Sequence, residues 1–201
     1  MDKRDLEQLL SNVADGSVAP ADALTRIQTA PTADLGFAQL DLSRGVRQGA
    51  GEVVYGAGKT AEQIAAIIEA LRDAGQEHIL VTRLDADKAA RTAELLDDNI
   101  DLGYVPDAQL ALVGGMPSPT GNGRIVVACA GTSDLPVAEE AALTAEFYGN
   151  EVDRLYDVGV AGLHRLLAHA EELAQAQVVI AIAGMEGALA SVIGGLVSCP
   201  V

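Results

Sequence analysis

The stretch Ile125-Val126-Val127-Ala128-Cys129-Ala130-Gly131-Thr132-Ser133-Asp134, followed by the segment from Pro136 to Tyr148, decides the fold of this chain. The six apolar residues 125–130 predict a strand buried on both faces, and residues 131–134 predict a tight turn. Proline is favoured in the first turn of a helix, so the segment that starts at Pro136 is predicted to be helical. The stretch therefore predicts one strand–turn–helix unit.

The same pattern occurs twice more before the last residue. Residues 152–158 lead through Gly159 and Gly162 into a predicted helix over 163–174, and residues 178–183 lead through Gly184 into a predicted helix over 186–197. Strands and helices that alternate at this spacing are typical of right-handed crossovers and a parallel sheet. We predict an α/β fold with three layers, in which a parallel sheet is covered by helices on both faces.

The N-terminal half has a weaker pattern. Two short helices are predicted before residue 28, and residues 31–51 are predicted to be a connection or an arm packed on another subunit. Strands over 52–56 and 78–83 alternate with helices over 60–74 and 85–96, and residues 104–105 predict a third, weaker strand. We expect N-terminal helices and an arm over 1–51, a small α/β domain over 52–112 and a second domain over 124–201, separated by a glycine- and proline-rich stretch.

Composition narrows the class of protein. The 201 residues are 49% apolar but only 3% aromatic, with no Trp, so we expect a core of Ala, Val, Ile and Leu. The net charge of -16 and the lack of a basic run make nucleic acid an unlikely partner, although backbone amides at helix N-termini can still hold an anionic small molecule. The two cysteines form no metal motif, and the charged N-terminus lacks a signal core, so we expect a cytoplasmic protein with no membrane segment.

Three turns are predicted to carry the chemistry, because ligands of open parallel sheets bind beyond the carboxyl ends of the strands. The first turn, Gly131-Thr132-Ser133-Asp134, suits a phosphate, but Ser133 or Asp134 could simply cap the helix. The second offers Asp157 and His164, a pair able to move protons near neutral pH, although a lone histidine is more often structural.

The third turn places Glu186 between Gly184 and Gly187 at a predicted helix N-terminus, where capping alone would also explain a glutamate. A fourth candidate is the turn of residues 56–60, Gly-Ala-Gly-Lys-Thr, which lacks the first glycine of a P-loop. Its Lys59 could still hold one phosphate, or the turn could be a plain strand-to-helix connection. Cys129 is predicted to be a core residue.

These residues carry a family resemblance. Residues 130–141 are similar to the Gly-Ser-x-Ser-Asp opening of PurE-type aminoimidazole ribonucleotide carboxylases, and residues 156–165 and 183–192 resemble LarB. Three further segments, 35–38, Asp41 and 55–60, resemble parts of LarB that PurE lacks, so the likeness covers nearly the whole chain. It implies a PurE-like or flavodoxin-like C-terminal domain after a smaller α/β domain.

The resemblance also implies an activity, because LarB enzymes make the first intermediate of the nickel-pincer nucleotide cofactor. They carboxylate the pyridinium ring of nicotinic acid adenine dinucleotide and hydrolyse its phosphoanhydride, which releases AMP. The pyridinium ring is too electron-poor to attack carbon dioxide, so the family adds a cysteine thiolate that converts the ring to an enamine. Carbon dioxide or bicarbonate is the co-substrate, no tightly bound cofactor is expected, and a requirement for Mg²⁺ stays open.

Carried over by motif, the resemblance implies a set of site residues. Asp157, His164 and Glu186 are the candidate catalytic residues, and which of them moves the ring proton stays open. The candidate substrate-binding residues are Gly131, Thr132, Ser133, Asp134, Gly159, Gly184, Met185 and Lys59.

One departure from the family concerns its nucleophilic cysteine, which lies beyond the point corresponding to Cys199-Pro200-Val201. We therefore expect these 201 residues to be an impaired fragment of a protein that forms a homo-oligomer at full length, with the helix over 187–197 packing on a neighbour. Two alternatives remain, namely a PurE-type carboxylase or mutase acting on aminoimidazole ribonucleotide, and a non-catalytic nucleotide-binding subunit.

Overall fold

The computed structural model describes residues 3–28, 32–42, 44–45 and 50–201, which form two compact units. The N-terminal unit comprises Met1–Tyr104 and Ala111–Gly115, and the C-terminal unit comprises Val105–Leu110 and Met116–Val201. Within the described ranges, no helix has both the length and the apolar content needed to cross a membrane.

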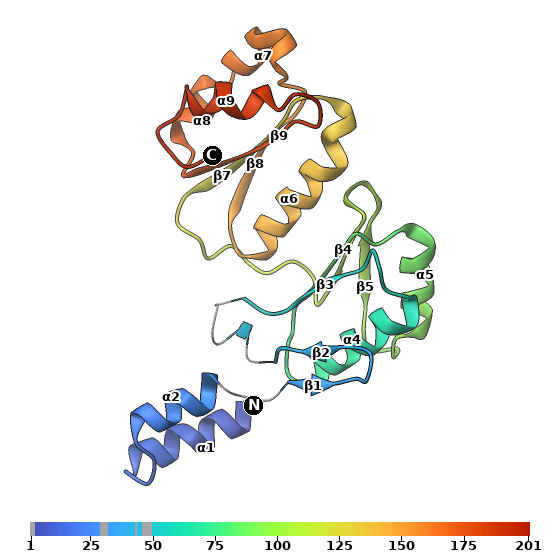
Figure 1. The fold of residues 1–201 in the computed structure, drawn as a ribbon, viewed down its shortest axis with the longest axis vertical. Coiled ribbons are helices and arrows are strands. Elements are labelled where there is room, and N and C mark those ends of the chain that lie inside the picture. Colours follow the sequence, from blue (N-terminus) through green and yellow to red (C-terminus); the bar gives the residue numbers. More distant parts are fainter. Residues whose placement is uncertain (1–2, 29–31, 43, 46–49) are drawn as a thin grey trace. The chain divides into compact units, whose positions relative to one another are not determined.

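The C-terminal unit is built on a three-stranded parallel sheet in the order β8-β7-β9. The strands are β7 (Arg124–Cys129), β8 (Glu151–Leu155) and β9 (Val178–Ile182). The helices are α6 (Leu135–Phe147), α7 (Leu163–Leu167), α8 (Ala170–Gln175) and α9 (Ala188–Gly194). The predicted α/β fold with a parallel sheet between helical layers is confirmed, and Figure 1 shows α6 on one side of this sheet and α7, α8 and α9 on the other.

The central strand β7 supplies both hydrophobic cores, because successive side chains of a strand point to opposite faces. Val127 and Cys129 pack with Ala138 and Ala142 of α6. Val126 and Ala128 pack with buried residues of the other layer, which include Leu166, Leu173, Leu189 and Ile193. Small alanines on α6 let that helix lie close to the sheet.

The strand order creates a topological switch point between β7 and β9. The chain leaves β7 for α6 on one face of the sheet and leaves β9 for α9 on the other face (Figure 1). The two turns therefore diverge and leave a crevice at the carboxyl ends of the strands. Two short 3₁₀ helices, Thr132–Asp134 and Val160–Gly162, follow β7 and β8 at the same edge.

The N-terminal unit begins with helices α1 (Lys3–Ala14) and α2 (Pro20–Gln28) and a hairpin of β1 (Ala33–Asp34) and β2 (Gln39–Leu40). Its main sheet has the order β3-β4-β6-β5. These strands are β3 (Val53–Tyr55), β4 (Ile79–Thr82), β5 (Leu102–Val105) and β6 (Leu110–Val113). Helices α4 (Ala61–Asp73) and α5 (Ala86–Leu95) follow β3 and β4, and Ile64, Ile68 and Leu71 of α4 are fully buried.

Several elements differ from the sequence expectation. Strand β6 was not predicted, and it pairs antiparallel with β4, so the sheet of the N-terminal unit is mixed. The helix predicted over 163–174 is two helices, since α7 ends at Leu167 and His169 precedes α8 with a non-helical backbone. The helix predicted over 186–197 begins only after Gly187, whose φ is +70°, and it ends at Gly194. Within the arm predicted over 31–51, residues 31, 43 and 46–49 lie outside the described residues.

Candidate functional site

A cavity of about 400 Å³ lies at the carboxyl edge of the C-terminal sheet. All three predicted turns contribute to its wall. The turn after β7 contributes Ala130, Gly131, Ser133 and Asp134. The turn after β8, together with the start of α7, contributes Gly159, Val160, Ala161 and Arg165. The turn after β9 contributes Ala183, Gly184, Met185 and Glu186, and α9 adds Leu189. The volume falls within the range of small-molecule sites, and the wall combines apolar side chains with a few charged groups, as such sites usually do.

The Asp134 carboxylate bridges the two sides of the switch point. Its Oδ2 accepts a hydrogen bond from the backbone N–H of Gly131 at 3.0 Å, and its Oδ1 accepts one from the N–H of Gly184 at 3.0 Å. A Cβ at Gly184 would lie only 3.0 Å from Oδ1, so a side chain there would press on the carboxylate. Asp134 therefore holds the turns after β7 and β9 at a fixed separation.

Gly159 brings the turn after β8 against the end of β7. Its N–H donates to the carbonyl oxygen of Ala130 at 2.9 Å, and the N–H of Val158 donates to that of Cys129 at 3.0 Å. A Cβ at Gly159 would lie 2.6 Å from the Ala130 oxygen, a backbone atom that cannot turn aside. Only glycine fits this contact without a backbone shift.

Among the residues that the structure describes, Arg165 is the only cation that lines the cavity, and it forms an ion pair with the Asp157 carboxylate. The guanidinium folds back over Gly162, where a Cβ would lie 2.7 Å from Nε. Asp157 has a left-handed backbone with φ of 58°, a conformation that aspartate tolerates better than most residues. We did not single out Arg165 from the sequence, and its position three residues after the turn glycine Gly162 was the available signal.

The cavity gathers most of the predicted site residues. Those that line it are Gly131, Ser133, Asp134, Gly159, Gly184, Met185 and Glu186. Asp157 is connected to it through Arg165, whereas His164 is exposed and does not line it. Thr132 lines a different pocket, and Lys59 belongs to the N-terminal unit. The chemical roles of these residues stay predictions.

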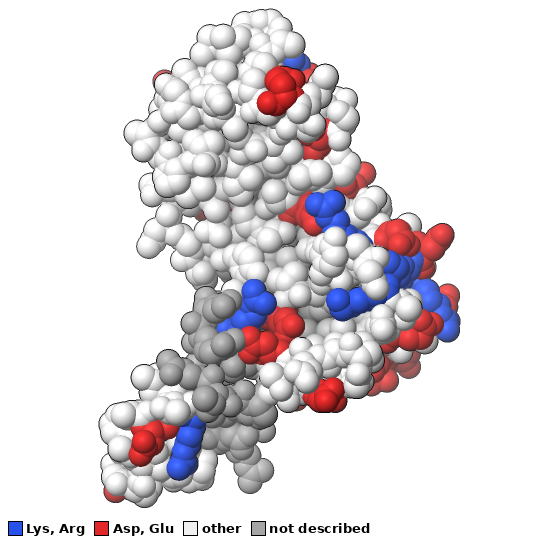
Figure 2. Space-filling view, viewed as in Figure 1, with Lys and Arg blue, Asp and Glu red and all other residues white. Residues whose placement is uncertain are grey.

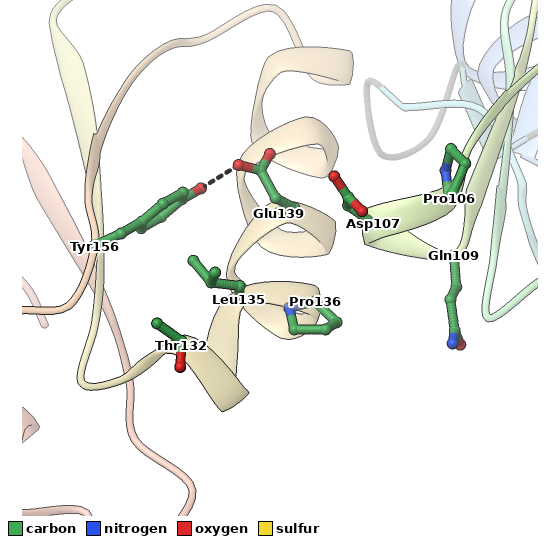
Figure 3. Close-up of a pocket in the computed structure, with 8 residues that line it drawn as sticks. All are labelled: Pro106, Asp107, Gln109, Thr132, Leu135, Pro136, Glu139 and Tyr156. Carbon is green, nitrogen blue, oxygen red and sulfur yellow. Dashed lines mark hydrogen bonds between the residues drawn. The ribbon is translucent and has the colours of Figure 1, made fainter.

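The pocket that Thr132 lines has a volume of about 510 Å³ and includes Glu139 and Tyr156 (Figure 3). The Tyr156 hydroxyl donates to Glu139 Oε1 at 2.8 Å, and Arg154 Nε lies 3.3 Å from Glu139 Oε2. Arg154 also forms a bidentate pair with Glu146, which raises the pKa of the guanidinium. Burial and then the bond to Glu139 raise the pKa of Tyr156, so its hydroxyl stays a donor. This network ties β8 to α6.

Neither cysteine lines the cavity. Cys129 is completely buried, as predicted, and burial raises the pKa of its thiol, followed by the nearby charge of Asp134 and Asp157. Cys199 is partly buried and packs against the core beneath α7, α8 and α9. Among the residues that the structure describes, no three His, Cys, Asp or Glu side chains form a cluster able to hold a metal ion.

Comparisons with known proteins find one domain match and one relative. The LarB/PurE-like N-terminal domain matches residues 32–114. The chain is also 35% identical over 167 residues to an uncharacterised protein of Methanocaldococcus jannaschii, a match that covers 81% of this chain and 65% of that protein. The chain thus spans less than two thirds of the curated relative. The chain therefore carries a LarB/PurE-like N-terminal domain over residues 32–114, followed by a unit built on a parallel α/β sheet.

Proposed function

We propose that this chain is part of an enzyme that carboxylates the pyridinium ring of nicotinic acid adenine dinucleotide and hydrolyses its phosphoanhydride, releasing AMP. The observation that carries the proposal is the cavity at the switch point, where three turns converge in a chain with a LarB/PurE-like domain. A LarB/PurE-like domain supports carboxylase-type chemistry in general, and the cavity supplies groups that suit a charged, ring-containing nucleotide.

The cavity has separate apolar and polar walls. Val160, Ala161 and Leu189 offer an apolar surface for a flat ring, and Arg165 offers a fork of N–H donors suited to a carboxylate or phosphate. Ser133 adds a hydroxyl at the start of α6. The ring carboxylate and the phosphate are both anionic, so Arg165 is the residue that we expect to orient the substrate.

The proposed carboxylation needs a nucleophile and a base. A thiolate adds to the pyridinium ring, the resulting enamine carbon forms a bond to carbon dioxide, and loss of the ring proton with departure of the thiolate restores the aromatic ring. Because Cys129 is buried with a raised pKa, it does not supply the thiolate. Of the three candidate bases, only Glu186 lines the cavity, so we propose that Glu186 removes the ring proton. Asp157 then serves to hold the Arg165 side chain in place through their ion pair.

The test has a binding step and a turnover step. Calorimetry should detect binding of nicotinic acid adenine dinucleotide to this chain. Arg165→Met should weaken that binding about tenfold, because one charge-assisted contact is lost. The longest chain that the gene encodes, given the dinucleotide and ¹³C-bicarbonate, should yield a labelled pyridinium product and AMP. A parallel reaction with EDTA tests the requirement for Mg²⁺.

Glu186→Gln should abolish labelling while binding is kept, and Glu171→Gln is the matched control, since it changes the same charge at an exposed position on α8. Label that enters aminoimidazole ribonucleotide instead would identify the PurE-type alternative. Binding without any label in product, in the longest chain, would identify a non-catalytic subunit and refute the enzymatic proposal.

A further inference from the structure

Charged side chains line the cavity at the carboxyl edge of the C-terminal sheet. Two are the carboxylates of Asp134 and Glu186, and one is the guanidinium of Arg165. Figure 2 shows that the visible face of this unit is mostly uncharged, while charged side chains of both signs gather over the N-terminal unit. A ligand that approaches from that face meets no extended charged surface, so the side chains of the cavity decide which charges the ligand must carry.

The strand order separates the positive group from one of the negative groups. Arg165 lies in α7, which follows β8, whereas Glu186 follows β9, and Asp134 follows the central strand β7. Neighbouring strands lie about 4.8 Å apart, so the turns after the two outer strands start about 10 Å from each other. The guanidinium and the Glu186 carboxylate therefore come from opposite flanks of the cavity.

The Arg165 guanidinium is held at two points. Nη1 forms the ion pair with Asp157, and the rest of the group lies over Gly162, where a Cβ would be 2.7 Å from Nε and 3.3 Å from Nη2. A guanidinium has five N–H donors in a rigid fork, so it keeps donors for a second, planar carboxylate. Because Asp157 already offsets its charge, Arg165 suits a singly charged group better than a multiply charged phosphate.

The other charged groups favour a positive ligand. Asp134 is held in place by the N–H groups of Gly131 and Gly184, each at 3.0 Å. Glu186 lies two residues after Gly184 and lines the same cavity. Together with Asp157, these carboxylates outnumber the single guanidinium at the cavity. The excess repels an anion that carries no positive charge of its own, and it attracts a cationic ring.

We propose that the cavity selects a ring that carries both charges, namely a quaternary pyridinium with one carboxylate substituent. Arg165 binds the carboxylate, and Glu186 and Asp134 stabilise the positive ring. Gly162 and Asp157 are positioning residues for the guanidinium. The inference rests on the proposed function, because it takes the pyridine dinucleotide as the ligand. It adds that Arg165 binds the ring carboxylate rather than a phosphate, and that an amide or an uncharged ring is disfavoured.

Four small ring compounds separate the two charges. N-methylnicotinate has both the pyridinium and the carboxylate, N-methylnicotinamide has only the pyridinium, nicotinate near neutral pH has only the carboxylate, and nicotinamide has neither. In NMR titrations of the ¹⁵N-labelled chain, binding should shift the amide signals of residues 131–134, 159–165 and 184–187. N-methylnicotinate should bind about tenfold more tightly than N-methylnicotinamide and about fivefold more tightly than nicotinate.

Variants assign each preference to a side chain. Arg165→Met should remove the tenfold preference for the carboxylate. Gly162→Ala should reduce that preference about threefold, because the nearest atoms that the added Cβ meets belong to the guanidinium. Glu186→Gln should remove most of the preference for the positive ring. Arg124→Met is the matched control and should keep both preferences, since Arg124 is an exposed cation that pairs with Asp153 at 3.2 Å and does not line the cavity.

The inference is overturned if N-methylnicotinamide binds as tightly as N-methylnicotinate, if the carboxylate preference survives in Arg165→Met, or if none of the four compounds binds. These outcomes are separate from the turnover test. Carboxylation of the dinucleotide by a chain without these preferences would leave the proposed function standing and overturn the inference. The same preferences in a chain that carboxylates nothing would refute the proposed function alone.

Discussion

Replacing Gly159 by alanine tests whether the turns after β7 and β8 must touch for the cavity to form. The added Cβ would lie 2.6 Å from the Ala130 carbonyl oxygen and 3.3 Å from its carbon, so the two backbones must separate by about 0.8 Å to reach an ordinary contact of about 3.4 Å. That movement stretches the hydrogen bond from the Gly159 N–H to the Ala130 oxygen, now 2.9 Å.

Two effects of opposite sign set the magnitude. Overpacking at a closely packed contact costs about 1–3 kcal/mol. Alanine also restricts the unfolded chain, and because Gly159 has an ordinary backbone with φ of -60° and ψ of 152°, this stabilises by about 0.4–1 kcal/mol. Because the overpacking cost exceeds the effect on the unfolded chain, we expect a net destabilisation of about 1–2 kcal/mol.

The assay is native-state hydrogen exchange read by mass spectrometry, since the chain has two units and a local readout is needed. Peptides that cover β7 and the turn after β8 should exchange about 5- to 30-fold faster in Gly159→Ala, while peptides of α4 should not change. Gly194→Ala is the control, because a Cβ at this helical residue meets nothing within 4 Å and should be neutral or stabilising. Equal protection of β7 in the Gly159 and Gly194 variants would refute the reasoning.

Four further outcomes are expected. Asp134→Asn should destabilise the C-terminal unit by about 1.5 kcal/mol, seen as faster exchange of the turns after β7 and β9, because an amide donor replaces one acceptor of its two N–H bonds. A thiol reagent should label Cys199 in the native chain and Cys129 only after unfolding, since Cys129 is buried with a raised pKa. The pKa of Tyr156 is raised in the folded protein, so its contribution to the free energy of unfolding is complete below about pH 10 and is lost as the pH rises further. In Tyr156→Phe, the free energy of unfolding should therefore fall less steeply with pH in this range. Leu167→Glu, at a residue of α7 that is 46% exposed, should reduce any self-association measured by light scattering in the longest chain that the gene encodes.

The sequence was sufficient to locate the cavity because general rules connect its parts. The runs of apolar residues and the spacing of the glycines identify the three parallel strands. Because the turns that follow parallel strands lie at the same edge of the sheet, Ser133 and Glu186 are expected at one edge, where both line the cavity. Both steps depend only on local pattern and chain direction. The residues on these turns were therefore accessible without coordinates.

What the sequence did not reveal depends on contacts between distant residues. Arg165 faces the cavity because its guanidinium folds over Gly162 to reach Asp157, and no local pattern encodes that direction. The double role of Asp134 needs Gly184, which is fifty residues away. Strand β6 was missed because four apolar residues next to a glycine-rich stretch give too short a signal.

The carboxylate that joins the turns after β7 and β9 acts as a spacer of fixed length. Its reach, one methylene beyond the backbone, sets how far apart the rims of the crevice stand at the point where Gly131 and Gly184 face each other. Because Asp134 also lines the cavity, lengthening that spacer to glutamate would change the width of the mouth and one part of the wall together, so the size of the molecules admitted depends on this one position.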